Sequence, residues 1–133
     1  MNVPSELPCG GSVLIVDDDV DGVDALRYLL ESHGYRVSSA GNGSEALQYL
    51  RGGARPSVVI LDLAMPVMNG WQFLAAREGD EALASIPVIV VTASQPAPGA
   101  ESEMVMTKPV DLDALLERIG TACRILPVAA RKH

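Results

Sequence analysis

The sequence has few aromatic residues, few cysteines and no long apolar run. Aromatic side chains make up 4% of the 133 residues, and the two cysteines, Cys9 and Cys123, lie near opposite ends of the chain. This spacing is not that of a metal-binding motif, so we expect two free thiols. A helix that crosses a bilayer needs about 20 consecutive apolar residues, and the apolar runs here are far shorter. Residues 1–6 also lack the basic and apolar regions of a secretory signal, so we expect a cytoplasmic protein with no membrane partner.

Basic residues are in the minority. Ten Lys and Arg stand against 17 Asp and Glu, which gives a net charge of −7 and argues against direct binding of nucleic acid phosphates. The hydrophobic fraction of 48% is typical of a folded chain, and the length allows one domain. The acidic residues are unevenly spread, because a single short stretch contains Asp17, Asp18, Asp19 and Asp21.

Five short segments have the apolar or β-branched composition of strands. They are Ser12–Val16, Arg36–Ala40, Ser57–Leu61, Val88–Thr92 and Met104–Met106. Most of these are continuous apolar runs, which are typical of parallel strands that are covered on both faces.

The sequence between the strands has the apolar spacing of helices. The apolar groups are Val23/Leu26/Leu30, Ala46/Leu47/Leu50, Trp71/Leu74/Ala75 and Leu112/Leu115/Leu116/Ile119/Cys123, with Asp111 placed to cap the last helix. Strands that alternate with helices predict a doubly wound α/β fold with a parallel sheet. Ligand sites of such sheets lie beyond the carboxyl ends of the strands.

Polar residues stand at the carboxyl ends of four predicted strands. Asp17 and Asp18 follow the first strand, Asp62 follows the third, Thr92 ends the fourth and Lys108 follows the fifth. Neighbouring carboxylates repel one another unless a cation lies between them, and Mg²⁺ takes one or two carboxylates together with waters and phosphate oxygens. A hydroxyl and an ammonium group can contact phosphoryl oxygens. The set therefore predicts phosphoryl transfer to an aspartate.

Four segments together resemble the receiver domain of response regulators in bacterial two-component signalling. They are residues 13–19 (VLIVDDD), 58–70 (VVILDLAMPVMNG), 90–93 (VVTA) and 107–109 (TKP). The resemblance implies a flavodoxin-like receiver fold with a five-stranded parallel sheet in the order 2-1-3-4-5. It also implies a receiver domain at residues 12–126, an N-terminal extension at 1–11 and a C-terminal tail at 127–133.

The resemblance also implies a role for each site residue. Asp62 would be the phosphoacceptor, and its donor would be a phosphohistidine on a sensor histidine kinase or a histidine phosphotransfer protein. Thr92 and Lys108 would contact the phosphoryl group. The ligands of Mg²⁺ would be Asp17, Asp18, Asp62 and the backbone carbonyl of Ala64. Such a domain is a signalling module rather than a turnover enzyme, and it acts on a downstream protein target.

Asp19 lies beyond the predicted metal pair. Asp before a helix commonly caps the helix, so we expect Asp19 to be a helix cap or a solvated acid.

The segment between Thr92 and Lys108 departs from the family pattern. Once the fifth strand is allowed for, Ala93–Ser102 remains, and this stretch contains Pro96, Pro98 and Gly99. Proline removes a helix donor, and an average helix needs about 11–12 residues. We therefore predict that the fourth helix is missing or shortened.

Two other functions remain open from the residues alone. One is a receiver-like scaffold that is never phosphorylated. The other is a small Mg²⁺-dependent phosphohydrolase, although its general acid would be expected two residues after Asp62, where Ala64 stands. The residues after Ile125 are too few for an output domain, so we expect either a stand-alone receiver that signals through a partner or a segment of a longer regulator or hybrid kinase.

Overall fold

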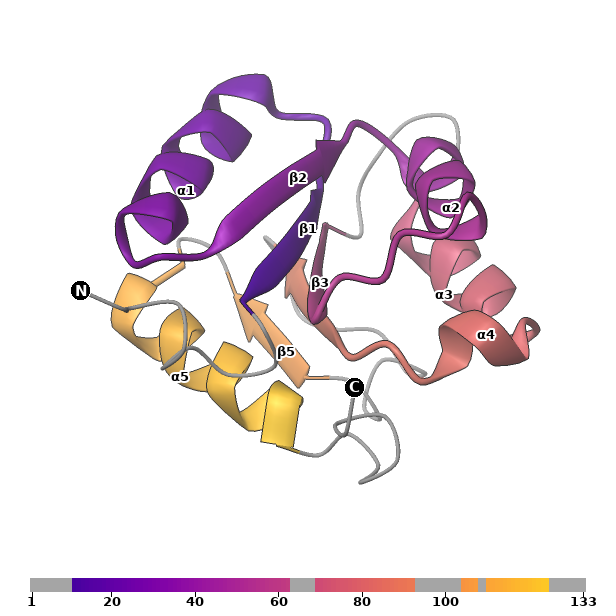
Figure 1. The fold of residues 1–133 in the computed structure, drawn as a ribbon. Helices are drawn as coiled ribbons and strands as arrows, with labels where there is room; N and C mark the ends of the chain where they lie inside the picture. The colour runs from indigo at the N-terminus through magenta and orange to yellow at the C-terminus, as the bar shows by residue number, and fades with distance from the viewer. Residues whose placement is uncertain (1–10, 63–68, 93–103, 108–109, 125–133) are drawn as a thin grey trace.

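The computed structural model describes residues 11–62, 69–92, 104–107 and 110–124. Strands and helices follow one another along the chain (Figure 1). The elements are β1 (Ser12–Val16), α1 (Val20–Ser32), β2 (Arg36–Ala40), α2 (Gly43–Arg51), β3 (Val58–Asp62), α3 (Gly70–Glu78), α4 (Glu81–Ala84), β4 (Val88–Thr92), β5 (Met104–Thr107) and α5 (Leu112–Arg124).

The strands form one parallel sheet in the order β2-β1-β3-β4-β5. This order confirms the doubly wound fold. In the register of the sheet, Val16 lies opposite Leu61, and Thr92 lies opposite Thr107. β3 begins and ends one residue later than predicted, so Asp62 is the last residue of the strand rather than the residue after it.

Helices cover both faces of the sheet. α1 and α5 lie on one face, and α2, α3 and α4 lie on the other (Figure 1). Successive strand residues point to opposite faces, so each strand contributes to two core clusters. The cluster under α2, α3 and α4 includes Leu14, Leu50, Leu61, Phe73 and Leu83. The cluster under α1 and α5 includes Ile15, Leu30, Ile89, Leu115 and Ile119. Burial of each such side chain contributes about 1.5–3 kcal/mol, which explains why unbroken apolar strands are needed here.

Local sequence signals set the ends of several helices. Gly34 follows α1 with a φ of 94°, as expected for the glycine at a helix C-terminus. The Asn69 side chain accepts from the N–H of Gln72, and the Gln72 side chain accepts from the N–H of Asn69, which forms a capping box. Asp111 Oδ2 accepts from the N–H of Ala114 at 3.3 Å, which confirms the predicted cap of the last helix.

The fourth helix along the described chain, α4, is short, with four residues. It precedes β4, where no separate helix was predicted. The stretch on which the prediction of a missing or shortened helix was made, Ala93–Ser102, lies outside the described residues.

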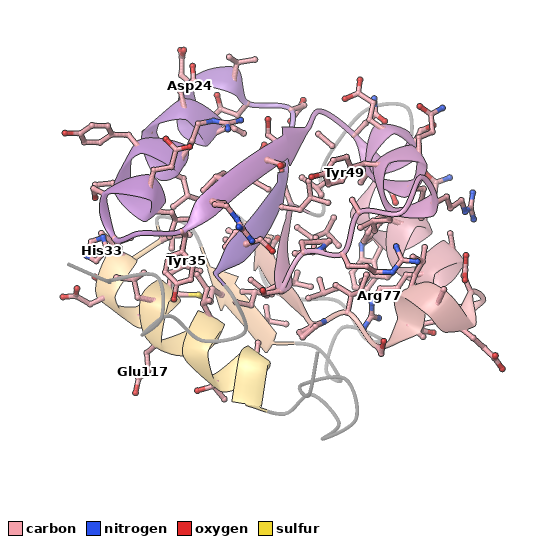
Figure 2. All side chains as sticks on the ribbon, in the orientation of Figure 1. Asp24, His33, Tyr35, Tyr49, Arg77 and Glu117 are labelled. Carbon is pink, nitrogen blue, oxygen red and sulfur yellow. The ribbon has the colours of Figure 1, made fainter. Side chains whose placement is uncertain are left out.

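Arg77 connects α3 to the chain beyond α4. Its guanidinium is buried, and its Nε and Nη2 donate to the carbonyl of Ile86 at 3.0 and 2.8 Å (Figure 2). Nη2 also donates to the carbonyl of Ala84 at 3.0 Å. These bonds satisfy backbone carbonyls at the end of α4 and hold the entry to β4.

Among the helices of the described residues, none is long and apolar enough to span a membrane.

Candidate functional site

Three aspartates meet at the carboxyl ends of β1 and β3. Asp17 and Asp18 directly follow β1, and Asp62 ends β3, which is the neighbouring strand. One carboxylate oxygen from each residue can be chosen so that all three oxygens lie within 4.8 Å of one another. The sheet therefore brings together carboxylates that are about 45 positions apart in sequence.

The three carboxylates differ in their exposure. Asp62 is buried, with 7% of its surface exposed, whereas Asp17 is half-buried and Asp18 is exposed. The N–H of Asp17 donates to the carbonyl of Ala40 at 3.0 Å, so the chain at Asp17 is attached to the end of β2. The site is thus deepest at Asp62 and opens to solvent at Asp18.

This donor set fits a hard divalent cation. Carboxylate oxygens are the ligands that Mg²⁺ prefers, and Mg²⁺ usually binds one or two of them and keeps several waters. A cation also removes the repulsion between closely spaced carboxylates. The exposure of Asp18 leaves the site accessible to water and to phosphate oxygens.

Thr92 lies at the same edge of the sheet. It ends β4, which is paired with β3, and Val91 stands opposite Asp62, so Thr92 is one position beyond the level of Asp62. Its side chain is buried, with 6% exposed. Thr92 also stands opposite Thr107, the last residue of β5. The predicted site residues Lys108 and Ala64 lie outside the described residues, so their places remain predictions.

Sequence reasoning missed one contact in the site. The backbone N–H of Asp19 donates to Asp17 Oδ1 at 2.9 Å. Asp19 occupies the N-cap position of α1, but its side chain makes no cap hydrogen bond. The prediction concerned only the side chain of Asp19, whereas its backbone makes the contact. The signal that could have found it is Asp17, because Asp side chains accept from the backbone N–H two residues on.

Comparison with known proteins identifies the family. The family model described as response regulator receiver domain matches residues 13–120. The chain belongs to the response regulator receiver domain family. Receiver domains are signalling modules of two-component systems, they bind Mg²⁺ at an acidic pocket, and they interact with histidine kinases or phosphotransfer proteins.

The receiver domain is similar to small proteins over most of their length. It is 35% identical to protein PilH of Pseudomonas aeruginosa over 118 residues, which covers 81% of this chain and 93% of PilH. It is 32% identical to the polar-differentiation response regulator DivK of Brucella anthropi, over 81% of this chain and 92% of DivK. It is also 37% identical to the transcriptional regulatory protein GlrR of Escherichia coli, of which it covers 26%. Receivers of this kind therefore occur both in short proteins and in longer ones.

Solved structures show the same fold. The response regulator TrrA of Thermotoga maritima, in complex with Mg(2+)-BeF, matches this receiver domain with a TM-score of 0.75 and 25% identity, over 84% of this chain and 98% of TrrA. The chemotaxis protein CheY4 of Vibrio cholerae matches with a TM-score of 0.75 and 28% identity, over the same shares of the two chains.

Proposed function

We propose that this receiver domain accepts a phosphoryl group on Asp62 in a Mg²⁺-dependent reaction. The donor is a phosphohistidine on a sensor histidine kinase or a histidine phosphotransfer protein. The observation that supports this most directly is the position of Asp62, a buried carboxylate at a strand end with Asp17 and Asp18 beside it. The carboxylate of Asp62 is thus shielded from solvent, as suits a nucleophile, and it lies next to the carboxylates that could hold a cation.

The transfer makes one bond and breaks one. A carboxylate oxygen of Asp62 attacks phosphorus, the new P–O bond forms an acyl phosphate, and the P–N bond to the donor imidazole breaks. The departing imidazole nitrogen keeps the electron pair and takes up a proton. Chemistry of this kind depends chiefly on positioning and on charge stabilisation.

The other site residues orient the reacting groups. Asp17, Asp18 and Asp62, with the backbone carbonyl of Ala64, would hold Mg²⁺, which when bound neutralises phosphoryl charge. Thr92 would donate its hydroxyl hydrogen to a phosphoryl oxygen, and Lys108 would pair with another oxygen as a point cation. The Mg(2+)-BeF complex of TrrA supports this assignment by likeness of fold.

The proposal also covers the bounds of the domain, its location and its mode of signalling. The receiver domain spans residues 12–126 between an N-terminal extension at 1–11 and a tail at 127–133. It is cytoplasmic, and it signals through contact with a downstream protein rather than through turnover of a substrate.

A mass measurement tests the proposal. The intact protein is incubated with Mg²⁺ and with acetyl phosphate or phosphoramidate, and we expect an adduct of about 80 Da, which is one phosphoryl group. The adduct should be absent in Asp62→Ala and in wild type with EDTA. Asp24→Ala is the matched control, because Asp24 is an exposed carboxylate that projects from α1 away from the sheet (Figure 2).

Each other outcome identifies a different function. A protein that folds and binds Mg²⁺ but forms no adduct with either donor or with a phosphorylated histidine kinase would be a scaffold. Multiple turnover of small phosphate esters would instead indicate a phosphohydrolase. An adduct that persists in Asp62→Ala would place the phosphoacceptor at another residue.

A further inference from the structure

The turn between β1 and α1 holds the carboxylate of Asp17 through backbone groups. The N–H of Asp19 donates to Asp17 Oδ1 at 2.9 Å, and the N–H of Asp17 donates to the carbonyl of Ala40 at 3.0 Å. The first bond orients the carboxylate relative to the turn, and the second attaches the turn to β2. Asp17 is therefore restrained on both sides by main-chain hydrogen bonds.

The side chain of Asp19 does not cap the helix that it precedes. Its carbonyl accepts from the N–H of Val23 at 2.9 Å, but its carboxylate makes no cap hydrogen bond. An aspartate at this position usually accepts from the backbone N–H two or three residues further along the chain. The carboxylate lies beside Gly22 instead, where an added Cβ would stand 2.8 Å from Oδ2. The backbone carbonyl of Asp19 thus accepts the first hydrogen bond of α1 and its N–H donates to Asp17, whereas its side chain does not cap α1.

We infer that the backbone N–H of Asp19 is a positioning group for Asp17 in the cation site. The inference rests on the proposed function, because it concerns a carboxylate that we assign to Mg²⁺. Mg²⁺ demands near-ideal octahedral geometry, so a carboxylate that is oriented before the cation arrives has less freedom to lose on binding. This holds whether Asp17 contacts the cation directly or through a water.

The same hydrogen bond lowers the repulsion within the site. Three carboxylates with oxygens within 4.8 Å of one another repel, and the partial positive charge of an N–H reduces the effective charge of the one that it contacts. Partners of this kind, which contact a metal ligand rather than the metal, change metal affinity by roughly 10- to 100-fold when they are removed.

Proline substitution tests the inference, because it removes the N–H and leaves the rest of the main chain. Asp19 has a φ of −86°, close to the value of about −65° that proline imposes. Asp19→Pro and Asp19→Ala both remove the carboxylate and its charge, and only Asp19→Pro also removes the donor. The dissociation constant for Mg²⁺ is measured by titration calorimetry, and the free energy of unfolding is measured in EDTA.

Val20→Pro controls for the effect of proline itself. Val20 is the first residue of α1, where proline is well tolerated, and Asp19 already has the extended conformation that a residue before proline requires. We expect Asp19→Pro to bind Mg²⁺ about tenfold more weakly than Asp19→Ala. Val20→Pro should bind within about twofold of wild type, because the Asp19 N–H remains. Equal affinities of Asp19→Pro and Asp19→Ala would overturn the inference, and a wild type that does not bind Mg²⁺ would overturn the proposed site itself.

A metal-free measurement covers the case in which Asp19→Pro does not fold. Asp17→Ala removes the acceptor, and Asp18→Ala removes a neighbouring carboxylate of equal charge. In Mg²⁺-free NMR spectra, we expect the Asp19 amide proton to move upfield and to exchange faster in Asp17→Ala than in Asp18→Ala. The same shift and exchange rate in both variants would contradict the inference, since the Asp17 carboxylate would then not hold this N–H.

Discussion

Asp62 combines two features that both disfavour a charged carboxylate. Its side chain is 7% exposed, and it stands beside two further carboxylates. Burial and like charge both disfavour an ionised carboxylate, and a bound cation would offset both effects. The same two features, at a position that ends a central strand, distinguish Asp62 from the surface acids that supply much of the net charge of −7.

Glycines at two helix ends give a prediction at the scale of single residues. Gly22→Ala should raise the free energy of unfolding by about 0.5–1 kcal/mol, because alanine favours a helix and the nearby atom, Asp19 Oδ2, is the end of a flexible side chain that can rotate away. Gly53→Ala should lower it by about 1 kcal/mol, because Gly53 has a φ of 112°. Urea unfolding measures both. A stability loss in Gly22→Ala would show that the carboxylate of Asp19 is fixed where it lies.

At the scale of elements, two arginines cover the outer edges of the sheet. Arg27 of α1 donates to the carbonyl of Val37 in β2 at 2.8 Å, and Arg118 of α5 donates to the carbonyl of Val105 in β5 at 2.9 Å. The N–H of Arg36 points toward β1, so alternation directs the carbonyl of Val37 away from the sheet. Edge strands are sites of unwanted pairing, and each arginine donates to a carbonyl of an edge strand from a helix on the face shared by α1 and α5.

A buried and an exposed arginine give the prediction for the α3–α4 connection. Arg77→Ala should lower the free energy of unfolding by about 2–4 kcal/mol, because the carbonyls of Ile86 and Ala84 lose a charged donor in a buried place. Arg51→Ala should change the free energy of unfolding by less than about 0.5 kcal/mol. Arg51 is exposed, and its contact with Asp80 is long, with 3.9 Å between Nε and Oδ2. Urea unfolding of both variants checks this, and similar losses would mean that the bonds of Arg77 contribute little.

At the scale of the whole molecule, cation binding should be coupled to folding. The aspartates of the candidate site come together only when β1 and β3 pair, so we expect Mg²⁺ to bind the folded chain and to stabilise it. At a free Mg²⁺ concentration 100-fold above the dissociation constant, the gain is about 2.7 kcal/mol.

Asp18→Asn makes this coupling testable. The substitution should raise stability in EDTA by about 1 kcal/mol, because one of three repelling charges is removed, and it should reduce the gain on adding Mg²⁺. Urea unfolding followed by the fluorescence of Trp71 provides the measurement. Asp24→Asn, an exposed acid of α1, is the control and should keep the full gain. A full gain in Asp18→Asn would exclude Asp18 from the cation site.

The sequence by itself determined the class of fold and the edge of the sheet at which the candidate site lies. Unbroken apolar strands such as Val58–Asp62 can be buried only in a sheet that is covered on both faces, and parallel strands bring their carboxyl ends to one edge. The strand pattern alone therefore places Asp17, Asp62 and Thr92 at the same edge of the sheet. Asn69 caps the start of α3 and Gly34 ends α1 through contacts with nearby residues, so the sequence also predicts some of the helix ends.

Only the tertiary structure decided which groups touch. The bond from the N–H of Asp19 to Asp17 Oδ1 is local, but the attachment of this turn to the end of β2 through the carbonyl of Ala40 depends on the pairing of strands that are distant in sequence. The burial of Arg77 depends on the carbonyls of Ala84 and Ile86, which belong to the chain after α3 and accept from its guanidinium in the folded structure. Residue type and periodicity predict the edge of the sheet at which the reactive side chains lie. Long-range packing sets the distances and many of the hydrogen bonds, because these depend on segments that are distant in sequence.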